Sequence, residues 1–350
     1  MSLIEEPPGS SETNSKYAFL HLAFRPFFLG TTSFAVVAMA LWMWVYSFGG
    51  LLPVTAISPF VWHAHEMIFG YTVGVISGFL LTAIQNWTGV PTIKGKSLLI
   101  LFLLWVGARI LFFIPVSTFE VTAIIDLLFF VLLIVAASKP VFQVKQYKQF
   151  GIILVLLLLL VSNSIFYLGV FQIIENGIHI GLYSGLYLIL LLIFIMARRV
   201  IPFFIEKGVD RPVQIKNFKW IDISVLIIFI LYALFDIFSL HQSSLMLFSG
   251  LLLILHSIRM IGWYSNGLWS KPLLWSLYVA YGFIVLGFAL KLLIHYYGFL
   301  PFLEIHSFAV GGIGLMTLAM MSRVALGHTG RNVFEPPKLI FWIVLVFTIA

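Results

Sequence analysis

The chain has 350 residues, of which 61% are hydrophobic and only 9% are charged, and its mean hydropathy is +1.09. This composition excludes a soluble globular protein, because no soluble domain of this length is so apolar. The sequence contains no cysteine. Thiolate-ligated haem, covalently attached c-type haem, iron–sulfur clusters and thiolate copper sites are therefore excluded, and any metal must be held by His, Met or carboxylate side chains.

Residues 1–26 read as a short disordered head and the lead-in to a first membrane span, without the charged-then-apolar order of a cleaved signal peptide. Ten apolar stretches follow, each of about 20 residues and so long enough to cross a hydrocarbon core of about 30 Å as a helix. They begin near Phe27, His65, Ser97, Phe119, Gln149, Ile180, Phe218, Leu245, Pro272 and Ile305.

An eleventh apolar stretch starts near Leu339 and stops at Ala350, too soon to cross, so we expect the C-terminal end to be truncated. The pattern predicts an all-α polytopic membrane helix bundle, with about eleven spans visible of a probable twelve. We expect residues 27–350 to form a single transmembrane helical domain.

The basic residues are distributed unevenly between the connections. Of the 20 Lys and Arg, all except Arg109 and Lys291 fall in the head and in alternate connections, and the other connections hold none. By the positive-inside rule, this asymmetry predicts a cytoplasmic N-terminus. The net charge of +7 is then explained by membrane topology, and we exclude nucleic acid as a partner.

Six of the nine histidines lie toward the predicted outer side of the membrane. They are His63 and His65 at the start of span 2, His179 at the start of span 6, His241 at the end of span 7, His295 at the end of span 9 and His306 at the start of span 10. Histidine is costly in lipid and is commonly a metal ligand or a proton carrier there, although interfacial polar residues also cap helices. Six on one side favour a metal centre near the outer water.

Spans 2 and 10 share a pattern that starts at a histidine. A glycine follows His65 five positions on and a Thr-Gly pair follows 23 and 24 positions on, and His306 is followed at the same spacings. Span 2 also carries Gly70, Gly74 and Gly78 on one face. Such a face predicts close helix packing; the alternative is a groove for a flat macrocycle whose axial ligand is the histidine.

Four charged residues lie inside predicted spans, all in the outer third: Arg109, Asp126, Asp236 and Lys291. Ion pairs between Arg109 and Asp126 and between Lys291 and Asp236 are the plain explanation. Intramembrane charges also mark functional sites, and the two cations could hold the propionates of a haem.

Several stretches resemble the NnrS family. They are FRPFFLG at 24–30, WHAHEMIFG at 62–70, IPFF at 201–204, PLLWSLYVAY at 272–281 and HSFAVGGIGLMTLAMMSRVALGHTGR at 306–331. The resemblance covers nearly the whole chain. It implies a bacterial inner-membrane protein of about twelve spans that contains haem and copper and is linked to nitric oxide and nitrosative stress.

A weaker resemblance is to the catalytic subunit of the haem–copper oxidases, which implies twelve spans and metal ligands on spans 2, 6, 7 and 10. The outer histidines of this chain on those spans are His63, His65, His179, His241 and His306. The following MIF motif favours His63 as the span-2 ligand, whereas the spacing shared with span 10 favours His65. The oxidase pattern of paired histidines is broken by Gln242 and Glu304, which puts a complete catalytic centre in doubt.

These observations lead to two functional hypotheses. In the first, a b-type haem and copper bind or turn over nitric oxide, with His306 and either His63 or His65 as axial ligands and with copper near His179 and His241. Imidazole suits both metals, and nitric oxide is small and apolar enough to arrive through the bilayer. In the second, the chain is a transporter or a metal-handling protein that uses the outer histidines. Whether it catalyses a reaction is left open.

Overall fold

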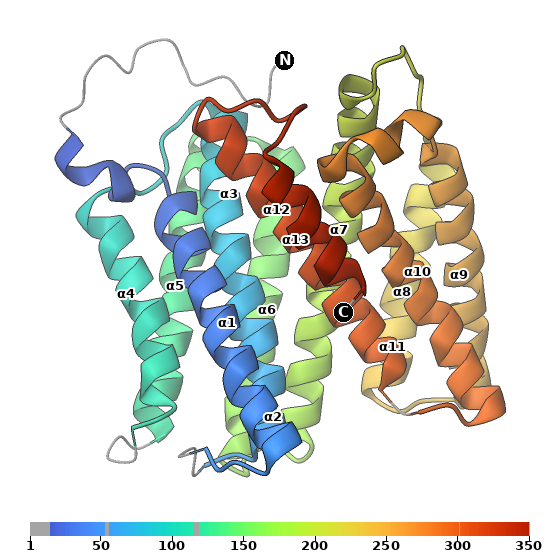
Figure 1. The fold of residues 1–350 in the computed structure, drawn as a ribbon. Helices are drawn as coiled ribbons and strands as arrows, with labels where there is room; N and C mark the ends of the chain where they lie inside the picture. Colours follow the sequence, from blue (N-terminus) through green and yellow to red (C-terminus); the bar gives the residue numbers. More distant parts are fainter. Residues whose placement is uncertain (1–14, 53–55, 115–118, 301, 350) are drawn as a thin grey trace. The chain divides into compact units, whose positions relative to one another are not determined.

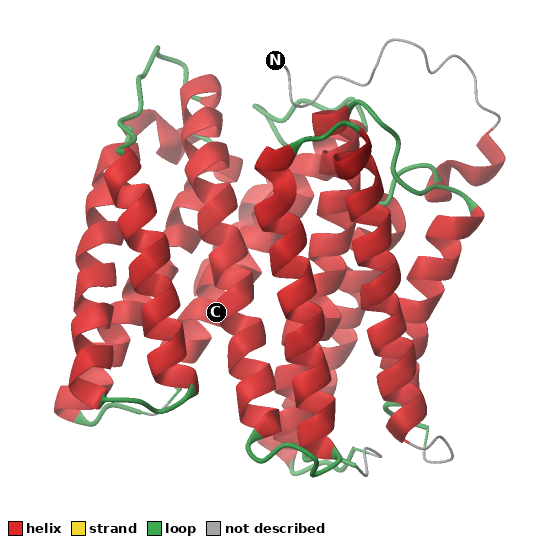
Figure 2. Cartoon of the chain, turned by 180° about the vertical axis from the view of Figure 1, so that it is seen from behind, coloured by secondary structure: helices red, strands yellow, loops and turns green. Residues whose placement is uncertain are grey.

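The computed structural model describes residues 15–52, 56–114, 119–300 and 302–349. Over these ranges the chain consists of helices and loops, with no strand (Figures 1 and 2). Its contacts divide it into two compact units, unit 1 (Met1–Leu188) and unit 2 (Ile189–Ala350). The single domain expected for residues 27–350 stays a prediction, and each unit is described by itself.

Unit 1 is a bundle of long helices connected by short loops. Its elements are η1 (Ser15–Leu20), α1 (Phe24–Phe48), α2 (Pro59–His65), η2 (Glu66–Thr72), α3 (Val73–Thr88), α4 (Lys96–Leu111), α5 (Phe119–Gln143), η3 (Tyr147–Gln149) and α6 (Phe150–Val170). The helix α7 (Gly177–Gly208) begins in this unit and ends in unit 2.

Unit 2 contains the remaining helices. They are α8 (Lys219–Ile237), α9 (Gln242–Trp263), η4 (Asn266–Ser270), α10 (Pro272–Tyr297), α11 (Leu303–His306), η5 (Ser307–Gly314), α12 (Leu315–His328) and α13 (Lys338–Ile349). Prolines open two helices, Pro59 in α2 and Pro272 in α10, where the missing N–H costs no hydrogen bond. Left-handed glycines end α1, α3 and α10.

The predicted polytopic all-α class is confirmed. Within the described residues, 9 helical segments are long and apolar enough to cross a membrane. The third expected span corresponds to α4, which has only 16 residues. The last apolar helix, α13, has 12 residues and is too short to cross. The likeness to the haem–copper oxidase fold stays a prediction.

Part of the segment predicted to be a disordered head is helical. Residues 1–14 lie outside the described residues, but Ser15–Leu20 forms a 3-10 helix and α1 starts at Phe24. Two contacts hold this segment against the start of α4: the backbone N–H of Gly95 donates to Leu20 O at 2.9 Å, and the Phe19 ring meets Phe102 edge-on. The contact of Phe19 with α4 therefore accompanies a helical structure in a segment whose polar composition had predicted disorder.

The glycine face of span 2 serves close packing, as the packing interpretation predicted. A Cβ atom on Gly74 would collide with Thr31 of α1 and Trp105 of α4, and one on Gly70 would collide with Arg109. The indole Nε1 of Trp105 also donates to Gly70 O at 2.9 Å. The groove for a flat macrocycle is therefore filled by side chains of α1 and α4.

The pattern shared by spans 2 and 10 has a structural counterpart. In unit 1 the π-helix η2 begins directly after His65, and in unit 2 the π-helix η5 begins directly after His306. The π-helix is rare, occurs mostly as a single widened turn inside an α-helix, and is frequent at functional sites. Each histidine therefore stands at a comparable point, where an α-helical turn widens inside a membrane-spanning segment.

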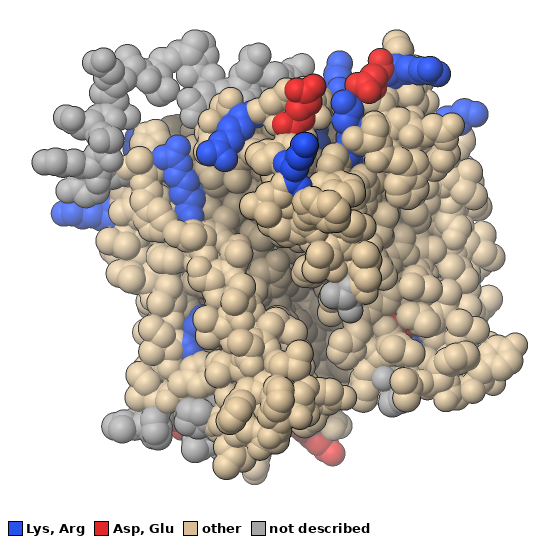
Figure 3. All heavy atoms as spheres, viewed as in Figure 1, with Lys and Arg blue, Asp and Glu red and all other residues tan. Residues whose placement is uncertain are grey.

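Lys and Arg side chains gather at one end of the helices in each unit (Figure 3). In unit 2 this end includes the last turn of α7, which carries Lys207. We predict that this end faces the cytoplasm, because basic residues are retained there. A reporter active only in the periplasm, fused after Lys207, should be inactive, while the same reporter fused after Ile174 should be active. Activity after Lys207 would contradict the topology.

Candidate functional site

A buried polar cluster lies in unit 1 where α2 passes into η2. Its members are His65, Glu66, Arg109, Asp126, Asn163 and Tyr167, from α2, η2, α4, α5 and α6. The side chains of His65, Glu66 and Asp126 are fully buried, and that of Arg109 is 4% exposed. So many ionisable groups inside an apolar bundle must neutralise one another, because an unpaired buried charge is very costly.

Arg109 joins the two carboxylates of this cluster. Its guanidinium forms an ion pair with Asp126, and Nη1 lies 3.0 Å from Oε1 of Glu66. The space that the guanidinium occupies exists because Gly70 has no side chain. The ion pair expected between Arg109 and Asp126 is therefore present, and Glu66 is a second anionic partner that the sequence analysis had not assigned.

Both ring nitrogens of His65 face side-chain oxygens. Nδ1 lies 2.9 Å from Oε1 of Glu66, and Nε2 lies 3.0 Å from Oδ1 of Asn163. The Asn163 amide is oriented by Asp126, whose Oδ2 accepts from Asn163 Nδ2 at 2.8 Å and from the Tyr167 hydroxyl at 3.0 Å. With its amide hydrogens directed at a carboxylate, Asn163 presents an acceptor to the imidazole.

The contacts of His65 bear on whether it can hold a metal. A neutral imidazole has one N–H and can donate to only one of the two oxygens that it faces, whereas an imidazolium donates to both. In either form both ring nitrogens already face protein oxygens, so a metal would have to displace Glu66 or Asn163 from the ring. The arrangement therefore does not favour His65 as an axial haem ligand, and that role stays a prediction.

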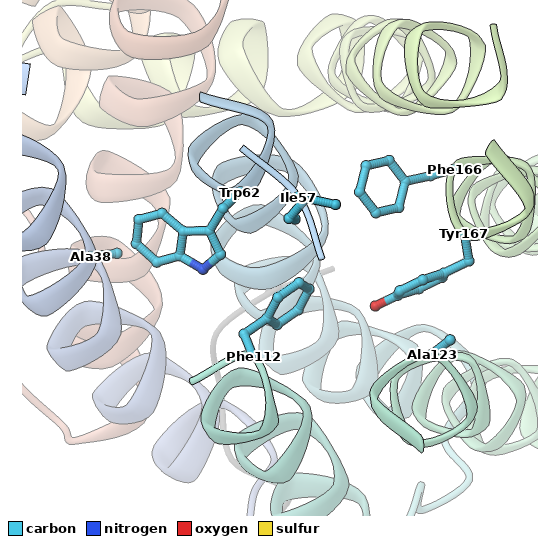
Figure 4. Packing of buried hydrophobic residues seen from close by; sticks show 7 residues of the cluster. All are labelled: Ala38, Ile57, Trp62, Phe112, Ala123, Phe166 and Tyr167. Carbon is cyan, nitrogen blue, oxygen red and sulfur yellow. The ribbon is translucent and has the colours of Figure 1, made fainter. Parts of the chain in front are cut away.

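Aromatic and apolar side chains seal the cluster from the surroundings. Figure 4 shows Trp62, Phe112, Phe166 and Tyr167 converging with the smaller residues Ala38, Ile57 and Ala123. The His65 ring lies among them, with its centroid 4.4 Å from that of Phe166 and 5.3 Å from that of Phe112. Such a low-dielectric shell strengthens each ion pair inside it.

The other two candidate histidines of unit 1 lie outside this cluster. The His63 ring stacks on Trp42 with centroids 4.2 Å apart and planes 10° apart, and it is partly buried. His179 is partly buried beside the ring of Tyr183, at 4.2 Å between centroids. Ligand roles for both residues stay predictions.

In unit 2, His306 and His241 present their rings differently. Nδ1 of the exposed His306 lies 2.9 Å from Phe302 O, and because a carbonyl only accepts, Nδ1 carries the hydrogen and Nε2 keeps a lone pair. His241 instead caps α9, where its Nδ1 accepts from the backbone N–H of Ser244 at 3.4 Å. A neutral His241 therefore carries its hydrogen on Nε2 and does not fit a copper ligand in this tautomer.

Lys291 of α10 forms the second expected ion pair, and Glu304 is an additional partner. Its Nζ lies 2.8 Å from Oδ1 of Asp236 and 3.5 Å from Oε1 of Glu304. Like Arg109, this cation already faces two carboxylates. Neither residue therefore fits the role of a haem propionate anchor, since a propionate would have to displace a protein carboxylate.

The sequence analysis did not assign a function to a third buried chain of polar groups, which lies in unit 2. Arg259 donates to Oδ1 of Asp222 at 2.7 Å and to the Tyr281 hydroxyl at 3.0 Å, and that hydroxyl lies 2.5 Å from Nδ1 of His256. His256 is fully buried against Phe194. The only sequence signal was its position inside an apolar span.

Within the described ranges, no group of three or more His, Asp or Glu side chains is arranged to hold a metal ion. The copper site predicted from His179 and His241 therefore lacks a further ligand among the residues described. His241 belongs to unit 2 and His179 to unit 1. Copper binding stays a prediction.

The comparison with protein families identifies the chain. The model of the NnrS protein family matches residues 18–350. The chain belongs to the NnrS family. A comparison with curated proteins finds no match. The match begins in η1 and includes all helices of both units, so the buried clusters described above belong to an NnrS protein with multiple membrane-spanning helices.

Proposed function

We propose that this NnrS protein is a haem- and copper-containing protein of the bacterial inner membrane that binds or turns over nitric oxide at a histidine-ligated centre on the outer side. Family membership and the predicted outer position of six histidines support this proposal. With no cysteine in the sequence, such a haem would be held by side chains without a thioether link, as a b-type haem is. When bound, it would supply the iron that binds nitric oxide.

The observation that carries the proposal is the orientation of His306. A histidine that ligates a metal usually donates its other ring N–H to a carbonyl or a carboxylate, which fixes the tautomer and the ring orientation. His306 meets this condition, since Nδ1 donates to Phe302 O at 2.9 Å and the ring is exposed. We therefore propose His306 as an axial haem ligand.

The test is the visible spectrum and metal content of the purified protein. The unaltered protein should show a Soret band, and His306→Ala should abolish or convert a six-coordinate spectrum because Nε2 supplies the ligand. The control is His295→Ala, another exposed histidine in unit 2, whose Nδ1 faces the Gln242 amide nitrogen at 3.3 Å. Unchanged haem content and spectrum in His306→Ala would overturn the assignment.

The alternative function is that of a transporter or metal-handling protein. Buried ion clusters within membrane-spanning helices favour it, because intramembrane charges commonly mark ion pathways. The same preparation separates the two functions. A Soret band supports the haem protein, whereas bound copper or zinc without a Soret band supports the alternative.

A further inference from the structure

A groove opens in unit 1 between α4, α5 and the loop that precedes α4. The two helices lie side by side (Figure 1), and residues 90–93 of the loop form a third wall. The volume of the groove is about 420 Å³, which is within the range of ligand pockets. Its floor is closely packed, since Leu101 and Ala136 are only 1% and 7% exposed. The groove is therefore a defined cavity on the side of the helix pair.

The lining of the groove changes from polar to apolar along the two helices. On α5, Lys139 is preceded on the same face by Val135 and Leu132, four and seven positions closer to the middle of the chain's membrane span. On α4, Ser97 in the first turn is followed by Ile100. The lining of α5 covers about 10 Å along the helix axis. The groove thus has a polar end and an apolar body, which is the polarity profile of a phospholipid.

The apolar body of the groove is open toward the outside of the protein. Ile100 and Val135, which line it, are 56% and 58% exposed although both lie well inside their helices. Exposed apolar side chains of this kind face acyl chains in a membrane bundle, because lipid tails are as apolar as the side chains themselves. A lipid can therefore enter the groove sideways from the bilayer.

Three lysines surround the polar end of the groove. Lys139 lines it, and Lys94 and Lys96 are each next in sequence to a lining residue. All three are exposed, and the ion pairs of the described residues include none of them. Neither residues 89–101 nor residues 131–146 contain Asp or Glu. The end of the groove therefore carries a local excess of positive charge, which attracts the anionic headgroups of lipids.

Two hydrogen bonds hold the loop wall of the groove in place. The Thr92 hydroxyl donates to Leu81 O of α3 at 2.8 Å, and the backbone N–H of Gly95 donates to Leu20 O at 2.9 Å. The loop is thus fixed to α3 at one point and to the end of η1 at another. Because the wall is already ordered, a ligand that enters the groove does not have to order it, and this lowers the cost of binding.

We propose that this groove binds one anionic phospholipid of the phosphatidylglycerol type from the leaflet at the basic end of the helices. The phosphate lies at Lys139, Lys94 and Lys96, whose ammonium groups are donors without acceptor capacity. One acyl chain lies along Val135 and Leu132. A zwitterionic lipid binds less tightly, because its own ammonium group is repelled by the lysines. The inference does not depend on haem or copper.

The test compares lipids added to the full-length, delipidated protein in detergent. The unfolding midpoint is followed as phosphatidylglycerol is added to the micelles, and the bound lipid is counted by native mass spectrometry. We expect the midpoint to rise and one phosphatidylglycerol to be retained per chain. Phosphatidylcholine with the same acyl chains and inorganic phosphate should have little effect, since the first has no net charge and the second has no acyl chain. An equal effect of either one would overturn the proposal.

Variants at the polar end test the role of the lysines. Lys139→Gln should weaken phosphatidylglycerol binding about fivefold, and the triple replacement of Lys94, Lys96 and Lys139 by glutamine should weaken it about 100-fold. The matched control is Lys148→Gln, an exposed lysine shortly after the end of α5 that does not line the groove. In detergent without added lipid, Lys139→Gln should unfold like the unaltered protein. Equal weakening by Lys139→Gln and Lys148→Gln would show that surface charge alone attracts the lipid, and would overturn the proposal.

A second pair of variants tests the apolar body without changing any charge. Val135→Gln places a polar group on the wall of the groove and should reduce the number of lipids retained. Val131→Gln is its control, because Val131 is a similarly exposed valine on α5 outside the groove. Lipid retention reduced equally in both variants would overturn the assignment of the acyl chain to this groove.

Discussion

Replacing Arg109 with glutamine is expected to lower the free energy of unfolding by about 3–5 kcal/mol, the usual cost of removing one partner from a buried ion pair. The variant keeps Glu66 and Asp126 fully buried but removes the cation that contacts both. The free energy can be obtained from reversible denaturation in detergent. The yield of membrane-inserted protein, measured in parallel, shows whether the loss is one of stability or of insertion.

The double variant Arg109→Gln with Asp126→Asn tests whether charge balance is the cause. It removes one charge of each sign and leaves Glu66 in contact with Nδ1 of His65 at 2.9 Å. We expect it to recover most of the lost stability. Lys139→Gln, at an exposed position of α5, is the control and should stay within about 0.5 kcal/mol of the unaltered protein. A double variant as unstable as Arg109→Gln alone would show that charge balance is not the cause.

The second large effect is expected at His65. Its replacement by glutamine removes the ring that contacts Glu66 and Asn163 and should destabilise the protein by about 3 kcal/mol, because both buried groups lose a partner. Adding Glu66→Gln removes the buried carboxylate that has lost its contact and should restore part of the stability. If His65 were a haem ligand instead, the second substitution would restore nothing and the Soret band would be lost in both variants.

His63→Gln is the matched control for His65. It lies on the same helix, but its ring stacks on Trp42. We expect it to cost less than His65→Gln and to be unaffected by Glu66→Gln. The comparison therefore separates the loss of the buried polar contacts of His65 from the loss of an aromatic contact.

The helical class and the positions of the spans could be predicted because they depend on the length and hydropathy of segments. Charge patterns also located Arg109 near Asp126 and Lys291 near Asp236, since opposite charges at equal depth in a bilayer tend to pair. The glycines at four-residue spacing indicated a smooth face. Span length, hydropathy and glycine spacing are local properties of the sequence, and the two ion pairs depend only on the depth of each charge in the bilayer.

Partners that depend on rotation about a helix axis could not be predicted. Nothing in the sequence shows that Glu66 and Asn163 occupy both nitrogens of His65, whereas His306 keeps one nitrogen free of such a contact. The two histidines share their spacing to later glycines, yet one is buried and the other is exposed. The shared spacing predicts the same backbone feature after each histidine, a π-helix. The surroundings of each imidazole ring depend instead on which helices pack against that segment.

The two π-helices each hold an extra residue without changing the rotational phase of the span that contains them. A π-helical turn holds more residues than an α-helical turn, so deleting one residue from η2 would let it revert to the α form. The rest of the span would then keep nearly the same rotational phase, because the residue removed is the extra one that the wider turn holds. The face of Gly74 would stay against α1 and α4, and only the residues within η2, Gly70 among them, would change their surroundings. Family sequences that lack one residue in η2 or η5 should therefore keep the same spans and lose only the widened turn.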